Sequence, residues 1–187
     1  MTNSICEPKS SDLIFIIGAN PRENHPVIGA KIKQAKRNNS KLILADPREI
    51  DLSEDADVYM QVNVGANIAL INGMIHVIIS ENLTDDRYIK EHTEGYEELK
   101  EMVKKYTPEM ASQICGVAPE KIIEAARLYA TSKASSIYYA MGITQFKTGT
   151  NAVISLSNLA LITGQIGRPG TGINPLRGQN NVQGSCD

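Results

Sequence analysis

The chain has 187 residues, with 19 Lys and Arg against 21 Asp and Glu, and its formal net charge of -2 gives no electrostatic footprint for nucleic-acid binding. This length suffices for one sizeable core but is short for two domains, and no apolar stretch reaches membrane-spanning length, so neither a second domain nor membrane insertion is expected. The three cysteines lack a C-x-x-C spacing, which argues against a disulfide framework or a self-contained iron–sulfur or zinc site and indicates a reducing compartment, with the cytoplasm as the default.

The first two predicted strands and the helix between them carry the fold prediction. A short apolar run at residues 13–17 ends in a turn at 18–21, an amphipathic segment spans residues 26–37, and a second apolar run at 42–45 ends at Asp46. Apolar runs this brief, bounded by Gly, Asn and Pro, are typical of strands that are covered on both faces. The segment between them is long enough for a right-handed crossover helix, so the pattern predicts a βαβ unit.

The turns of this unit point to a nucleotide site. In an open parallel sheet, ligands bind beyond the carboxyl ends of the strands, where backbone N–H groups and a helix N-terminus can hold phosphate. Residues 18–26 occupy that position, and Asp46 stands where such units often hold a ribose or a base. The usual G-x-G-x-x-G fingerprint is absent, so this would be a variant cradle. From the pattern alone, a plain turn at Gly18 and Asn20, with Asp46 as a helix cap, is an equally supported alternative.

The rest of the chain repeats this alternation. A third strand is predicted at residues 58–62 and a fourth at 137–141, and each ends in a polar turn that contains Gly. Helices are predicted at residues 68–79, from about 85, at 96–106, from 107, at 118–130 and at 149–166. If all strands are parallel, the turns line one edge of the sheet, where an extended nucleotide-like ligand would bind. The predicted fold class is therefore α/β, a three-layer, mostly parallel sheet with helices on both faces, of dinucleotide-binding, Rossmann-like type.

Both ends of the chain are predicted to be irregular. Residues 1–11 are polar and form a lead-in to the first strand. Residues 168–187 are rich in Gly, Asn and Gln and lack apolar periodicity, and so long a loop in a compact domain is usually functional or disordered. Because these residues offer little apolar burial to offset the entropy of ordering, we expect them to be mobile without a ligand.

A set of short motifs, in uninterrupted order, carries a family resemblance. The motifs are GANP at residues 18–21 with HP at 25–26, ADPR at 45–48, MGITQ at 141–145 and NPLRGQNNVQG at 174–184. Together they resemble the catalytic subunit of formate dehydrogenases, which are molybdopterin oxidoreductases. The resemblance covers essentially the whole chain, and its most specific part is the segment from Arg177 onward.

The resemblance implies one domain of a larger enzyme. Residues 1–167 would be an α/β cofactor-binding domain of a four-domain subunit, and residues 168–187 a loop of the same domain that faces cofactor and substrate. The domain would help to hold one of two molybdopterin guanine dinucleotides that chelate molybdenum or tungsten. In the family, the metal's selenocysteine or cysteine ligand and the cysteines of a [4Fe-4S] cluster lie upstream of the matched region. The chain is therefore expected to be a fragment that supplies no metal ligand and is inactive alone.

Residue by residue, the resemblance assigns cofactor-binding roles to the turns after the predicted strands. The first turn matches positions at the dinucleotide end of the cofactor, and the second turn meets its guanosine. The third and fourth turns face the cofactor, and one further residue lies next to Arg177 on the cofactor side. In that order these residues are Gly18, Asn20 and Glu23; Asp46 and Arg48; Gly65 and Asn67; Met141, Gly142 and Gln145; and Gln179.

Arg177 matches the family's arginine beside the metal, which holds formate. This role is chemically reasonable, because formate is a single carboxylate that a guanidinium fork can bind through two parallel hydrogen bonds, with its C–H directed toward an acceptor. The arginine would supply orientation and charge, while the metal–sulfur group takes the hydride and electrons. A lysine could not reproduce the planar contact. The alternative is a surface arginine in a mobile tail.

The histidines and cysteines are expected to have surface, packing or structural roles. The histidines are widely separated and show no metal-ligand spacing, and the cysteines have no feature that supports reactivity. These residues are His25, His76, His92, Cys6, Cys115 and Cys186.

The resulting hypothesis is a fragment of a subunit that oxidises formate to carbon dioxide and passes two electrons to an iron–sulfur cluster. Its expected partners are formate, the remaining domains of the same subunit and an electron-accepting iron–sulfur or flavin subunit. One alternative is another molybdopterin oxidoreductase, such as a nitrate reductase. A second is a non-catalytic nucleotide-binding domain, which would bind guanine dinucleotide without requiring Arg177.

Overall fold

The computed structural model describes residues 1–179. A five-stranded sheet with the order β3-β2-β1-β4-β5 lies at its centre, and every neighbouring pair is parallel. The strands are β1 (Leu13–Ile17), β2 (Lys41–Ala45), β3 (Val58–Met60), β4 (Ser135–Tyr139) and β5 (Gly172–Pro175). Because β1 has β2 on one side and β4 on the other, the chain reverses its direction across the sheet at β1. Such a switch point is where ligands bind in open parallel sheets.

The register brings the carboxyl ends of all the strands together. Ile17 pairs with Ala45 and with Tyr139, Ala45 pairs with Met60, and Tyr139 pairs with Pro175. Each of these is the last residue of its strand, so they form one row across the sheet. The segments that follow the strands therefore leave from the same edge.

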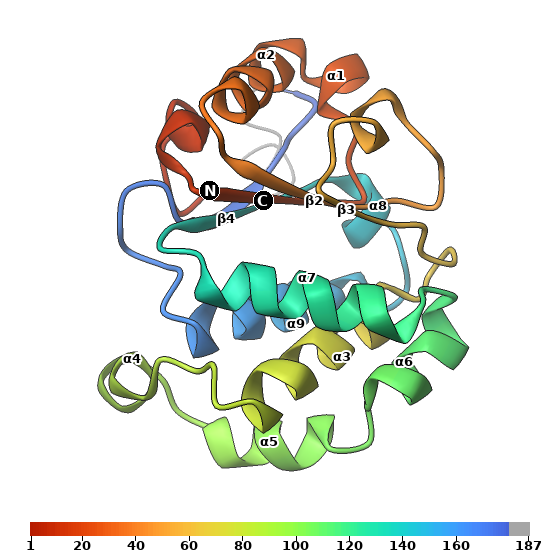
Figure 1. Cartoon of the computed structure of the whole chain (residues 1–187), viewed down its shortest axis with the longest axis vertical. Coiled ribbons are helices and arrows are strands. Elements are labelled where there is room, and N and C mark those ends of the chain that lie inside the picture. Colours follow the sequence, from red (N-terminus) through yellow and green to blue (C-terminus); the bar gives the residue numbers. More distant parts are fainter. Residues whose placement is uncertain (180–187) are drawn as a thin grey trace.

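Helices cover both faces of the sheet (Figure 1). One face carries α2 (Pro26–Arg37), with the short α1 (Pro21–Asn24) before it. The other carries the helices α3 (Asn67–Ser80), α7 (Pro119–Thr131) and α9 (Gly149–Ile162). Beyond this layer lie α4 (Asp86–His92), α5 (Tyr96–Val103) and α6 (Pro108–Cys115). The shorter segments are η1 (Glu7–Ser10), η2 (Asp51–Ser53) and α8 (Met141–Thr144).

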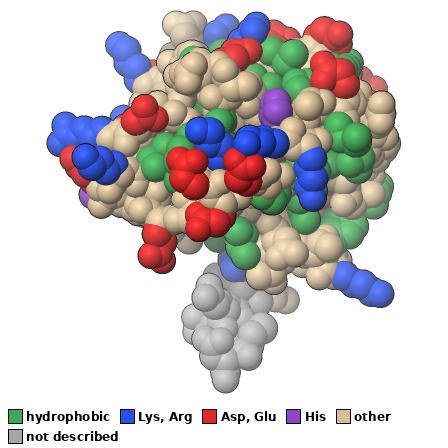
Figure 2. All heavy atoms as spheres, turned by 90° about the horizontal axis from the view of Figure 1, so that it is seen from below, with side chains coloured by type: hydrophobic (Ala, Val, Ile, Leu, Met, Phe, Trp, Pro, Cys, Tyr) green, Lys and Arg blue, Asp and Glu red, His purple; other side chains and the backbone are tan. Residues whose placement is uncertain are grey.

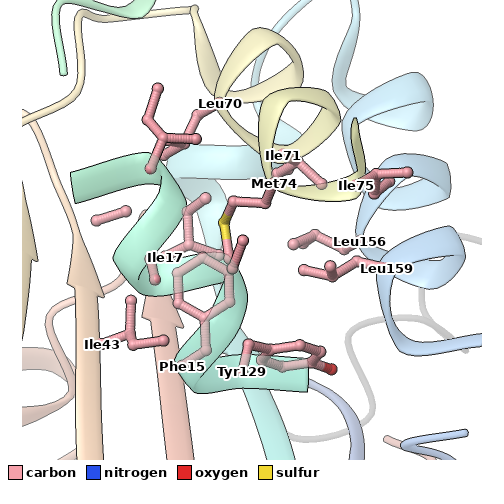
Figure 3. Close-up of a cluster of buried hydrophobic side chains, with 14 of the residues drawn as sticks. Phe15, Ile17, Ile43, Leu70, Ile71, Met74, Ile75, Tyr129, Leu156 and Leu159 are labelled. Atoms are coloured by element: carbon pink, nitrogen blue, oxygen red, sulfur yellow. The ribbon is translucent and has the colours of Figure 1, made fainter. Parts of the chain in front are cut away.

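Two clusters of apolar side chains, one on each face, explain the continuous apolar runs of the central strands. All five residues of β1 are buried: Leu13, Phe15 and Ile17 belong to the larger cluster, and Ile14 and Ile16 to the one under α2. In the larger cluster, side chains of β1 and β2 point toward α3, α7 and α9 (Figure 3). Full burial of one such side chain contributes roughly 1.5–3 kcal/mol.

The outer helices cover α3, which explains why it is apolar on nearly every side. It packs against α7 and α9 and also against α5 and α6. On the outward face of the outer helices, acidic and basic side chains intermingle (Figure 2). One of the ion pairs in the structure joins α7 to the end of α3, where Arg127 Nε and Nη2 each donate a 2.8 Å hydrogen bond to Glu81. No helix within residues 1–179 is long and apolar enough to cross a membrane.

The predicted α/β class with a parallel sheet is confirmed. The helix predicted at residues 26–37 has the same bounds as α2, and the one predicted at 68–79 differs from α3 by one residue at each end. The helix predicted to reach residue 166 is too long, because α9 ends at Ile162 and Gly164 follows in the left-handed region with a φ of 62°. The fourth strand ends at Tyr139, and Met141 instead begins α8.

The prediction that residues 168–187 form an irregular loop is wrong for Gly172–Pro175, which forms β5. This strand has no apolar run. Its pairing with β4 holds it in place, as do contacts from the first residues of the chain. The backbone N–H of Thr2 donates to Ile173 O at 3.1 Å, and Thr2 Oγ1 accepts from Ile173 N at 2.9 Å. Within residues 1–11, also predicted to be irregular, Glu7–Ser10 forms a 3-10 turn. The predictions for residues 180–187 lie outside the described residues.

Candidate functional site

The row of strand ends opens into a cleft of about 500 Å³. Its walls are the turns that follow β1, β2, β3 and β4, together with the segment after β5. It therefore lies at the switch point of the sheet, where the pattern of the sequence places a nucleotide-like ligand.

The turn after β1 and the turn after β4 touch backbone to backbone. Gly142 N donates to Gly18 O at 3.1 Å, and Gly18 has a φ of 58°, in the left-handed region. A Cβ on Gly142 would lie 2.6 Å from Gly18 O, and one on Gly18 would lie 2.7 Å from the carbonyl carbon of Gly142. Both positions need glycine, because no side-chain atom fits between the two turns.

A side chain joins the turn after β3 to the same place. Asn67, the first residue of α3, is 7% exposed and donates from Nδ2 to Gly142 O at 3.2 Å. Nearby, Gly65 has a φ of 83°, and a Cβ there would lie 3.6 Å from the ring of Phe146. Asn67 therefore holds the walls of the cleft in register in addition to lining it.

Asp46 places a buried carboxylate in the wall of the cleft. It directly follows β2, is 5% exposed, and accepts a 2.9 Å hydrogen bond at Oδ1 from Arg48 N. Burial raises the pKa of Asp46, and the hydrogen bond and charge of Arg48 only partly oppose this. The guanidinium of Arg48 lies 3.9 Å from Oδ1, and the other carboxylate oxygen has no partner within residues 1–179. A desolvated acceptor of this kind favours a ligand with N–H or O–H groups.

The raised pKa of Asp46 predicts that Asp46→Asn stabilises the ligand-free 187-residue chain at neutral pH. Because the folded-state pKa lies above the ordinary value of 3.8, ionised Asp46 opposes folding, and the contribution of Asp46 to the stability of the parent falls as pH rises from that value to the folded-state pKa. The gain in the variant should therefore grow over this interval and then stay constant. Urea unfolding between pH 3 and pH 7 measures it.

The control for this experiment is Asp57→Asn, which should have the opposite sign. Burial tends to raise the pKa of Asp57, but hydrogen bonds from Lys36, Leu42 N and Lys41 outweigh it and lower the pKa below its usual value. Ionised Asp57 thus supports folding at neutral pH, and its contribution is lost as pH falls through the lowered pKa. Equal losses of stability in both variants at pH 7 would contradict the assignment for Asp46.

A second, smaller cleft of about 220 Å³ adjoins the first and contains Arg177 and Gln179 in its wall. The two clefts share Ala140, Met141, Leu176 and Gly178. Arg177 is exposed, and its carbonyl oxygen lies 3.0 Å from His25 Nε2, across from the turn that follows β1. The smaller cleft thus places a cationic guanidinium beside the larger cleft.

The predicted site residues divide between these clefts. Glu23 and Gln145 line neither: Glu23 N donates to Asn20 Oδ1 in a helix cap, and Gln145 Nε2 lies 3.2 Å from Met141 Sδ. Arg177 and Gln179 line the smaller cleft, and Met141 lines both. The residues that line the larger cleft are Gly18, Asn20, Asp46, Arg48, Gly65, Asn67, Met141 and Gly142.

Sequence reasoning missed several cleft residues. His25 was expected to have a surface or packing role, but it lines the larger cleft, and its Nδ1 is buried without a partner within residues 1–179. Its position inside the segment 18–26, already singled out as a cradle, was a usable signal. Asn63, Phe146 and Leu176 also line the cleft. Asn63 and Phe146 come from the polar turns predicted after the third and fourth strands, and Leu176 lies in the motif at 174–184, so their positions were a usable signal too.

The residues present fit a nucleotide more readily than a bare metal ion. The largely buried carboxylate of Asp46 and Nδ1 of His25, which has no partner within residues 1–179, are polar groups in the wall, and the cleft is lined by residues from several turns. Within residues 1–179, no group of three or more His, Cys, Asp or Glu side chains is arranged to hold a metal.

The chain is similar to known proteins over its whole length. A family model described as "Molybdopterin oxidoreductase" matches residues 1–186. The alpha subunit of F420-dependent formate dehydrogenase 1 from Methanococcus maripaludis is 55% identical over 187 residues, which are 100% of this chain and 28% of that protein. Formate dehydrogenase H from Escherichia coli is 47% identical over 187 residues, 100% of this chain and 26% of that protein. The chain thus spans about a quarter of the length of these relatives.

A solved structure shares the fold. Acetylene hydratase from Pelobacter acetylenicus matches with a TM-score of 0.83 and 31% sequence identity, over 89% of this chain and 23% of that one. The match extends the similarity to an enzyme whose name denotes a different reaction.

Proposed function

The chain belongs to the molybdopterin oxidoreductase family, and we propose that it is the part of a formate dehydrogenase catalytic subunit that holds one molybdopterin guanine dinucleotide. The observation that carries this proposal is the larger cleft, a switch-point site with a buried carboxylate, continuous with a smaller cleft that contains an arginine. Isolated from the rest of the subunit, the chain should not turn over substrate, because residues 1–179 contain no group of side chains that could hold the metal.

Each wall of the larger cleft would hold a different part of the dinucleotide. The turn at Gly18 and Asn20 lies at the carboxyl end of β1, where backbone N–H groups suit phosphate oxygens. Asp46 suits the guanosine, because its desolvated carboxylate can accept from the N–H edge of guanine or from ribose hydroxyls. Arg48, Gly65, Asn67, Met141 and Gly142 would complete the wall. Glu23 and Gln145 would act by shaping the adjoining turns.

Asp46→Asn should weaken cofactor retention although it stabilises the free chain. A hydrogen bond to a charged group contributes about 1.5–3 kcal/mol, so a loss of roughly 10- to 100-fold in affinity is expected. The measurement is the pterin content of the purified complete subunit, parent against variant, after dialysis for matched times. Equal retention would contradict a role for Asp46 in holding guanosine.

The smaller cleft would hold the substrate. Arg177 can bind a carboxylate through two parallel hydrogen bonds and so fix the orientation of formate, while Gln179 and the shared residue Met141, which line the same cleft, would face the dinucleotide. The bound cofactor, with molybdenum or tungsten held by two pterins, would supply the two-electron redox chemistry. The contribution of this chain is charge, orientation and the exclusion of water around the substrate.

The proposal extends to the rest of the enzyme. The other domains of the subunit would provide the second dinucleotide, the metal ligand and a [4Fe-4S] cluster, and an iron–sulfur or flavin subunit would accept the electrons. The isolated cysteines agree with a reducing cytoplasmic location.

The assignment of formate as the substrate rests on Arg177 and its surrounding motif. The fold alone cannot choose, since the same architecture occurs in acetylene hydratase. The test is to produce the complete subunit in a host that makes the cofactor, and to assay formate oxidation with a dye acceptor beside nitrate reduction with a reduced dye. Formate oxidation without nitrate reduction is expected. A cofactor-loaded subunit that reduces nitrate and ignores formate would overturn the substrate assignment.

A further inference from the structure

We propose that His25 is a positioning residue that fixes where Arg177 stands. Its imidazole joins the turn after β1, in the wall of the larger cleft, to the backbone of the substrate arginine in the smaller one. This inference rests on the proposed function, which gives Arg177 its role, and names a residue that couples the two clefts.

The first support is the scarcity of other anchors near Arg177. Leu176 N donates to Tyr139 O at 2.8 Å, which is the last backbone hydrogen bond after β5 within the described residues. Among all hydrogen bonds within residues 1–179, the contact of His25 Nε2 with Arg177 O, at 3.0 Å, is the only one made by residues 177–179. Within the described residues, His25 is therefore the hydrogen-bonding anchor of the arginine backbone.

The second support is the rigidity of the residue that provides the contact. His25 lies between α1 and α2. Its backbone N–H donates to Pro21 O at 3.2 Å, and its backbone carbonyl accepts from Gly29 N at 2.9 Å. Pro26 fixes the backbone immediately after it. The imidazole thus projects from a well-held corner, and it can transmit the position of the dinucleotide turn to a segment 152 residues further along the chain.

The chemistry of the contact also assigns the ring hydrogens. A carbonyl oxygen can only accept, so Nε2 must carry the hydrogen that is donated to Arg177. Nδ1 is buried and has no partner within residues 1–179. Because glutamine can place its amide nitrogen near the position of Nε2 and leucine cannot donate, the two substitutions separate the hydrogen bond from the bulk of the ring.

The test compares His25→Leu and His25→Gln in the complete, cofactor-loaded subunit. The matched control is His76→Leu, because His76 Nδ1 makes a similar 3.0 Å contact with Val103 O, far from the clefts. Four quantities are measured: the exchange rate of the Leu176 amide hydrogen, the pterin content, kcat for formate and KM for formate. The exchange rate reports on the anchoring of the segment even if formate is not the substrate.

In His25→Leu, the Leu176 amide should exchange roughly tenfold faster, because the end of β5 frays once the backbone of Arg177 is released. KM for formate should rise about tenfold while kcat changes less than threefold, since a displaced guanidinium binds the substrate less well. His25→Gln should restore the Leu176 exchange rate and KM to within about twofold of the parent. His76→Leu should change neither the exchange rate nor KM.

Two results would overturn the proposal. Exchange of the Leu176 amide at the parental rate in His25→Leu would show that the contact anchors nothing. Loss of pterin in His25→Leu, with a parental KM in the loaded fraction, would make His25 a cofactor ligand instead. A parent subunit that does not oxidise formate would refute the proposed function, and the exchange rates would still decide whether His25 holds the segment.

Discussion

Replacing Arg177 by lysine in the complete subunit should lower kcat/KM for formate by about 10²- to 10³-fold with the cofactor still bound. The reason is geometric. A guanidinium presents two parallel donors to a carboxylate, whereas an ammonium is a point charge on a flexible stem and cannot fix the direction of the formate C–H. Arg177 is exposed and has no side-chain hydrogen bond within residues 1–179, so the substitution should cost the fold little.

The measurement is steady-state formate oxidation with a dye acceptor, normalised to pterin content. Arg127→Lys is the matched control, since Arg127 also makes two parallel hydrogen bonds to a carboxylate, that of Glu81, but on the other side of the molecule. Its kcat/KM should equal that of the parent. If Arg177→Lys retained more than a third of the parental kcat/KM, the proposed contact with formate would be wrong.

The second large effect concerns the contact between the turns after β1 and β4. Gly142→Ala should destabilise the 187-residue chain by about 3 kcal/mol, the upper end of overpacking costs, because the added Cβ meets backbone that cannot rotate away. The added Cβ would lie 2.6 Å from Gly18 O, which already accepts a hydrogen bond from Gly142 N. For a chain of this size, the melting temperature should fall by roughly 6–12 °C.

Thermal unfolding followed by circular dichroism measures this effect. Gly178→Ala is the control, since a Cβ there meets nothing within 4 Å, and its melting temperature should stay within about a degree of the parent. In the complete subunit, Gly142→Ala should also lower pterin content, because separating the two turns opens the cleft. An unchanged melting temperature for Gly142→Ala would mean that the turns are not in close contact.

The sequence was most informative where local pattern and burial agree. The apolar run of β1 is buried at every position, and α2 begins at Pro26, which is suited to a first helical position. These features are local, so they can be recognised without knowing the fold. Recognition of strand ends also placed Gly18 and Asp46 in one cleft, because parallel strands end at the same edge of a sheet.

What the sequence did not reveal depends on contacts between distant segments. The strand β5 has the sequence Gly-Ile-Asn-Pro and is a strand only because β4 and Thr2 pair with it. The bond from Asn67 to Gly142 and the contact of His25 with Arg177 join residues far apart in the chain. Such pairs leave no periodic signal, so they became visible only when the sheet register was known.

If the larger cleft holds the dinucleotide end of the cofactor, the crystal structure of the complete, cofactor-loaded subunit will show it there. Guanine is expected beside the carboxylate of Asp46, and phosphate oxygens against the backbone at Gly18 and Asn20. A guanine dinucleotide bound outside this cleft, with Asp46 in contact only with protein or water, would contradict this placement of the cofactor.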